Sequence, residues 1–120
     1  MTQIQNTKKY DLEERTLSFA KKIRDFIKIT PKNISNFEYG KQLIRSASSV
    51  GANYIEANES FSKKDFIHKV KICRKEAKES KYWLELTEVE ERSLNQKRQD
   101  LLKEAMELMM IFGSIIRRLE

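Results

Sequence analysis

Three glutamates on two predicted helices are the residues whose type and spacing could do chemistry. Glu56 lies near the end of one helical stretch, and Glu76 and Glu79 lie in the next. Carboxylates on the facing helices of a bundle bind di-iron when two of the helices also supply Glu-x-x-His pairs. The only histidine is His68, and its nearest match to that motif begins at Asp65. One such pair is insufficient, so the sequence predicts no metal site and no cofactor.

The candidate nucleophiles lack a partner base. Cys73 falls on an apolar stripe, where a free cysteine packs as a small hydrophobic side chain. Serines cluster between Ser46 and Ser49, but a serine nucleophile needs an adjacent general base such as histidine. The sequence also has no Gly-rich phosphate-binding loop. We therefore expect no catalytic residues and predict that the protein is not an enzyme.

Lysines and arginines give the clearest functional signal. The net charge is +6, and residues 62–82 hold eight Lys and Arg against three Asp and Glu. Such cations neutralise phosphates and release counterions, which gives salt-dependent binding with little sequence specificity. No base-reading motif accompanies them, and docking of an acidic partner protein is the alternative interpretation. The residues predicted to contact nucleic acid share one side of a helix: Lys64, Lys71, Arg74, Lys75 and Lys78.

Four amphipathic helices position these residues. Apolar residues recur in steps of three and four, Ser35 and Ser62 begin capping boxes, and Thr30-Pro31 stops the first helix. Short connections between long helices predict one all-α domain over residues 11–120, an antiparallel up-down four-helix bundle. The predicted helices are 12–29, 36–58, 63–91 and 97–119, after a flexible lead-in over residues 1–10.

The predicted second helix has an unusual uncharged stretch. No charged residue occurs from Ser46 to Ile55, although 35% of the chain is charged. Most of these side chains are small, and Gly51 in mid-helix costs about 1 kcal/mol relative to alanine. A helix with one solvent-exposed face should carry at least one charged residue over ten positions. We infer that more than one face of this helix is covered, which suggests a subunit interface.

Polar residues of the second helix form a single stripe, here called the polar seam. If it is covered, its members must be hydrogen-bonded. The favoured interpretation is a seam that fixes helix register and oligomer geometry, with a ligand or metal pocket and simple solvent exposure as the alternatives. The polar seam consists of Arg45, Ser46, Ser49, Asn53 and Glu56.

Nothing in the sequence indicates export or a membrane span. The single cysteine cannot form an internal disulfide, and Met1 to Asn6 lacks a signal-peptide pattern. The longest apolar stretch, from Leu108 to Ile116, is too short to cross a bilayer. The expected location is the cytoplasm.

Three segments resemble a known bacterial family. They are Arg45–Ala57 (RSASSVGANYIEA), Ser62–Phe66 (SKKDF) and Lys71–Ala77 (KICRKEA). Their pattern is similar to that of the four-helix bundle family named for the 23S ribosomal RNA intervening-sequence protein. Many members carry proline near the position of Gly51 and glycine at that of Ala57, so this chain departs from the pattern locally.

The resemblance implies an assembly and partners that the residues alone do not. It implies a homopentameric ring of up-down bundles. Relatives include the accessory protein of diversity-generating retroelements, a basic ring that binds nucleic acid and a reverse transcriptase. We therefore expect a homo-oligomeric, non-enzymatic adaptor that binds RNA or DNA.

Overall fold

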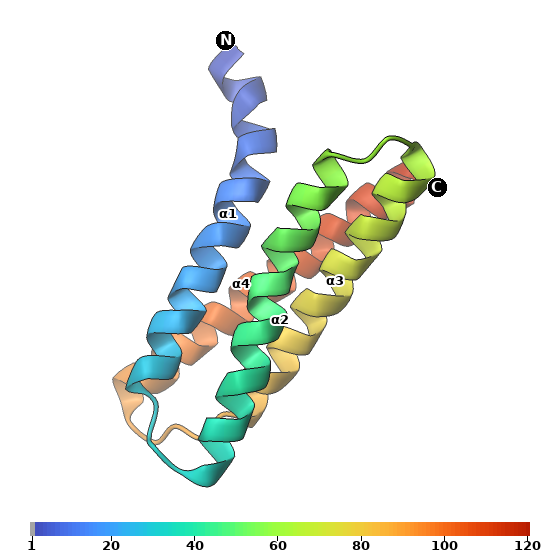
Figure 1. Cartoon of the computed structure of the whole chain (residues 1–120). Coiled ribbons are helices and arrows are strands. Elements are labelled where there is room, and N and C mark those ends of the chain that lie inside the picture. The colour runs from blue at the N-terminus through green and yellow to red at the C-terminus, as the bar shows by residue number, and fades with distance from the viewer. Residues whose placement is uncertain (1) are drawn as a thin grey trace.

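The chain forms four helices that run up and down in sequence order. The computed structural model describes the backbone from Thr2 and the side chains from Leu12 to Glu120. This part of the chain contains helices and no strand, which confirms the predicted all-α class. Figure 1 shows α2 between α1 and α3, with α4 crossing behind them. The helices are α1 (Thr2–Ile29), α2 (Ile34–Asn58), α3 (Lys63–Leu86) and α4 (Arg92–Leu119).

Side-chain caps fix where α2 and α3 begin. Ser62 is the cap predicted for α3, and its Oγ accepts a hydrogen bond from the Asp65 amide at 3.1 Å. The predicted cap of α2 is wrong, because Asn33 takes the place expected for Ser35. The Asn33 Oδ1 accepts from the Asn36 amide at 2.8 Å, so α2 begins two residues before the predicted start.

The first helix is longer than predicted. α1 begins at Thr2, whereas the sequence predicted a flexible lead-in over residues 1–10 and a helix from residue 12. No proline or glycine occurs between Thr2 and Tyr10, so nothing in this segment stops a helix from extending toward the N-terminus. Met1 lies outside the described residues.

The third connection also differs from its prediction. α3 ends at Leu86 instead of residue 91, and α4 begins at Arg92 instead of residue 97. Thr87 leaves the helix with an extended backbone (φ −61°, ψ 130°). The Asn36 side chain holds the loop, since it donates to the Glu88 carbonyl at 2.9 Å and accepts from the Glu88 amide at 2.8 Å. Contacts from a distant helix, which periodicity does not encode, thus end α3.

One apolar core runs along the bundle axis. Each helix buries a single stripe against it, as the steps of three and four predict. Within the described residues, no helix combines the length and the apolar character that crossing a bilayer requires. The largest fully buried side chains include Phe19, Ile23, Leu43, Leu84, Leu108 and Phe112.

A glycine lets α1 approach α2 closely. A Cβ on Gly51 would lie 2.9 Å from the Thr16 Oγ1 and 3.2 Å from its Cβ. The Thr16 hydroxyl donates to the Leu12 carbonyl at 2.8 Å, so it cannot turn away without losing that bond. The cost of a mid-helix glycine is therefore offset inside the chain, by α1. This corrects the inference that Gly51 indicates cover from another subunit.

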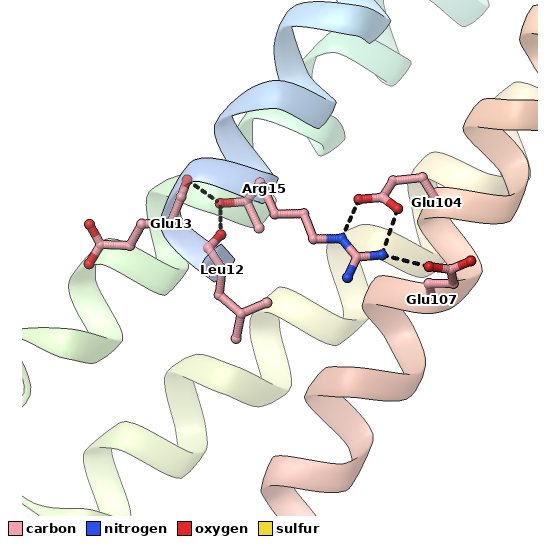
Figure 2. Close-up of polar contacts among 6 residues, drawn as sticks. Leu12, Glu13, Arg15, Glu104 and Glu107 are labelled. Atoms are coloured by element: carbon pink, nitrogen blue, oxygen red, sulfur yellow. Dashed lines mark hydrogen bonds and ion pairs between the residues drawn. The ribbon is translucent and has the colours of Figure 1, made fainter. Parts of the chain in front are cut away.

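An arginine fork links the first helix to the last. Figure 2 shows Arg15 reaching from α1 to two carboxylates of α4. Its Nε and Nη2 donate to Glu104 at 2.7 and 2.8 Å, and Nη2 also donates to Glu107 at 2.6 Å. The hydrogen bond with Glu104 is the main cause that raises the pKa of Arg15 above its ordinary value. The fork therefore stays charged and holds α1 to α4 in a fixed register.

We expect Gly51→Ala to lower the free energy of unfolding by up to about 2 kcal/mol. Overpacking typically costs about 1–3 kcal/mol, which outweighs the roughly 1 kcal/mol that alanine gains in helix propensity. Urea denaturation of the wild type, Gly51→Ala, Thr16→Ala and the double variant measures the coupling. Removing the Thr16 hydroxyl should shrink or reverse the penalty. If Gly51→Ala lowered the free energy of unfolding equally in the wild type and in Thr16→Ala, the close approach of α1 to α2 at Gly51 would be contradicted.

Candidate nucleic-acid interface

Four lysines line the outer side of α3 and are here called the lysine row. The helix buries Val70, Cys73 and Ala77 completely, so the opposite side faces solvent. All four lysines are exposed there, and their steps of seven, four and three residues keep them on one face. At 1.5 Å per residue, the row extends over roughly 21 Å. The lysine row consists of Lys64, Lys71, Lys75 and Lys78.

Most of this positive charge is uncompensated. Lys71 pairs with the Glu120 carboxylate at 2.8 Å, with both side chains about half exposed. Among the side chains described, no carboxylate lies within ion-pair distance of Lys64, Lys75 or Lys78. Unpaired ammonium groups retain their full attraction for an anionic polymer. The row is thus available to phosphates.

Arg74 does not extend the lysine row. It turns toward α4, where its Nη1 lies 3.8 Å from the position that a Cβ on Gly113 would occupy. Of the five cations predicted to contact nucleic acid, the structure therefore brings four onto one face. The fifth belongs to a different surface between α3 and α4.

The polar seam packs α2 against α3 within one chain. Ser46 is fully buried, and its Oγ lies 2.9 Å from the Ser80 Oγ. The Ser80 hydroxyl also donates to the Glu76 carbonyl at 2.9 Å. A residue enclosed in this way cannot reach another subunit. The prediction that Ser46 lies in an oligomer interface is therefore wrong, whereas a role in helix register fits these contacts.

The rest of the polar seam is also engaged inside the chain. The Ser49 hydroxyl and the Asn53 amide bond carbonyls of their own helix, at 2.9 and 2.8 Å. Arg45 pairs with Glu79 of α3 at 3.2 Å, and Glu56 pairs with Lys69 at 2.8 Å. The two ion pairs tie the edges of α2 to α3.

A different side of α2 is the one left uncovered. Six uncharged residues form this surface, here called the α2 outer face, and one cation lies among them: the Lys41 ammonium is 5.0 Å from the centroid of the Phe37 ring. Ile34 is 85% exposed, Phe37 66% and Ile55 54%, which is unusual for large apolar side chains on one helix. The uncharged stretch thus has an exposed side in the single chain. The α2 outer face consists of Ile34, Phe37, Ile44, Ser48, Ala52 and Ile55.

The carboxylates considered for chemistry do not converge. Glu56 and Glu79 are each paired with a cation, and Glu76 is buried with its Oε1 lacking a hydrogen-bond partner among the described side chains. His68 is exposed on α3. From Leu12 onward, no three His, Cys, Asp or Glu side chains gather as a metal-ligand set.

Comparison with known proteins identifies the fold family. The family model described as 23S rRNA-intervening sequence protein matches residues 8–114. The chain belongs to this family. A solved structure of similar fold is a protein of unknown function from the S23 ribosomal protein family of Bacteroides thetaiotaomicron VPI-5482. It is 33% identical, with a TM-score of 0.74 over 88% of this chain and 97% of that chain. No curated protein matches the chain.

Two features of this family member were not found by sequence reasoning. The α2 outer face could have been found from Ile34, Phe37, Ile44 and Ile55, which share one side of a helix. The Arg15 fork has no local signal, because its carboxylates lie about ninety residues away along the chain.

We expect the Cys73 thiol to be unreactive in the folded protein. It is fully buried, and burial raises its pKa from about 9 to about 12. At pH 8, the thiolate fraction is then on the order of 10⁻⁴. A disulfide reagent should label the cysteine rapidly in urea but only at the rate of chain opening in buffer. Prompt stoichiometric labelling of the folded protein at pH 8 would contradict its place in the core.

Proposed function

We propose that this protein is a non-enzymatic adaptor that binds the backbone of RNA or DNA. The observation that carries the proposal is the lysine row, of which Lys64, Lys75 and Lys78 have no carboxylate partner among the described side chains. Each strand of a duplex carries one phosphate for about every 3.4 Å of the helix axis. A row of roughly 21 Å spans several of them, so one helix can neutralise several phosphates together.

One end of the lysine row widens into a cationic hollow. Lys63, Lys64, His68 and Lys71 line a depression of about 550 Å³, together with Ile67 and Glu120. This hollow lies at the beginning of α3, where the free amides of a helix favour anions. This end of the lysine row therefore offers two further groups, Lys63 and His68, to a nucleic-acid strand, while Glu120 offsets the charge of Lys71.

The adaptor role includes assembly through the α2 outer face. Its isoleucines and Phe37 expose apolar surface that a second copy would remove from water. The polar seam and Gly51 are occupied inside the chain, which leaves this face as the surface available on α2. A homopentameric ring would repeat the lysine row around its circumference, and linked rows bind one strand with higher avidity.

We expect removal of the lysine row to weaken nucleic-acid binding. The variant Lys64→Gln/Lys75→Gln/Lys78→Gln should bind a fluorescent single-stranded RNA or DNA about tenfold or more weakly in anisotropy titrations. Its affinity should also depend less steeply on salt, because fewer counterions are released.

A charge-matched variant is the control for this titration. Lys32→Gln/Lys97→Gln/Lys103→Gln removes the same net charge from exposed lysines outside α3. This control variant should keep most of the wild-type affinity for RNA or DNA. Equal losses in both variants, or wild-type binding that is insensitive to salt, would contradict a defined interface. Binding to an acidic protein in place of RNA and DNA would favour the alternative, a protein scaffold.

The α2 outer face has its own test. We expect light scattering to give an oligomer for the wild type and a mass near 14.3 kDa for Ile44→Lys/Ile55→Lys. The cause is that burying two unpaired ammonium groups in an apolar interface costs several kcal/mol. Leu17→Lys/Ile29→Lys places the same two charges on exposed apolar residues of α1 and should leave the assembly intact. A monomeric wild type at micromolar concentration would refute this interface.

A further inference from the structure

A hollow between α3 and α4 has an apolar floor of methionines. Its volume is about 500 Å³. Met106 is 49% exposed and Met110 69%, and Met109 is half-buried beside them. Methionines are frequent at surfaces that bind apolar partners, because their flexible thioether chains adapt to differently shaped groups. We call this surface the methionine groove.

Two guanidinium groups converge at one end of the methionine groove. Gly113 is buried on the side of α4 that faces α3. The Arg117 Nη1 lies 3.4 Å, and the Arg74 Nη1 3.8 Å, from the position that a Cβ on Gly113 would occupy. Two arginines, one from each helix, therefore lie near the same backbone position at ordinary van der Waals distances. Two cations at one site together attract an anion.

No carboxylate among the described side chains forms an ion pair with Arg74 or Arg117. The pKa of Glu120 is lowered chiefly by the hydrogen bond from Lys71, with which Glu120 is paired, and to a smaller extent by the charge of Arg74. The groove has a third cation, Lys81, which pairs with Glu85 at 3.3 Å on an exposed helix turn. The lining of the groove contains no acidic residue. The groove thus combines an apolar floor with a purely cationic rim.

The geometry points to docking of an acidic amphipathic helix from a partner protein in the methionine groove. Its apolar stripe would pack on Met106, Met109 and Met110, in the mode by which helices lie in hydrophobic grooves. A carboxylate on its flank would bridge Arg74 and Arg117, since the planar guanidinium forks match carboxylate geometry. This partner is additional to the nucleic acid proposed for the lysine row.

Nucleic acid and a second copy of this chain fit the methionine groove less well. Phosphates gain nothing from methionine side chains, and the unpaired lysine row offers them a longer charged surface. A second copy would have to present an acidic apolar face. The α2 outer face contains no carboxylate and its charged neighbour on that side is the cation Lys41, and Glu104 and Glu107 of α4 are already bound to Arg15. A helix of another protein is therefore the occupant that matches both the apolar methionines of the floor and the positive charge of the rim.

The test uses a synthetic peptide as the probe. A labelled helical peptide with leucines in steps of three and four and glutamates elsewhere should bind the full-length protein in anisotropy titrations. A scrambled peptide of identical composition should bind about tenfold or more weakly, because it lacks an apolar stripe. Methyl NMR of the methionines gives a second readout, in which the methyls of Met106, Met109 and Met110 should shift when the peptide binds.

Variants separate the groove from the lysine row. Arg74→Gln/Arg117→Gln should weaken peptide binding about tenfold, whereas Lys64→Gln/Lys75→Gln/Lys78→Gln should leave it nearly unchanged. Equal binding of both peptides, or no shift of the groove methyls, would overturn the proposal. Loss of RNA binding or of assembly in Met106→Gln/Met110→Gln, without an effect on the peptide, would assign the groove to those partners instead.

Discussion

The close approach of α1 and α3 to the backbone of α2 is the constraint on which this bundle depends. Gly51 admits Thr16 on one side, and Ser46 meets Ser80 on another at hydroxyl contact distance. Larger residues at these positions would force the helices apart and open the core to voids. Small side chains in α2 therefore serve the interior of a single chain. The outward orientation of the lysine row follows, because the seam and the core together fix the rotation of α3.

Local sequence signals account for much of the fold. The Ser62 cap, the stop at Pro31 and the apolar steps of each helix act within a few residues, so periodicity and capping rules find them. The ends of α3 and α4 were misplaced because Asn36, some fifty residues away, holds the loop at Glu88. A one-dimensional pattern cannot show which distant side chain will interrupt a helix.

The candidate surfaces also divide into features that local sequence predicts and features that depend on contacts between helices. Exposed lysines at steps of seven, four and three lie on one face of any straight helix, so the lysine row could be predicted. Arg74 lies between the outer face and the side toward α4, and its guanidinium packs near Gly113 of α4, a contact between helices that the pattern of α3 alone does not give. Small residues in α2 indicated close packing correctly, but the sequence could not say whether the neighbour was another subunit or α1.

The order of the helices has a consequence for how the chain reaches this structure. α1 packs on α2, α2 on α3 and α3 on α4, so most tertiary contacts join elements that follow each other in sequence. Topologies of this kind have low contact order and fold in microseconds to milliseconds. The Arg15 fork is the exception, since it joins the first helix to the last. During synthesis, α1, α2 and α3 can dock as they leave the ribosome. The Arg15 fork can form only after α4 has emerged, and it then completes the four-helix bundle.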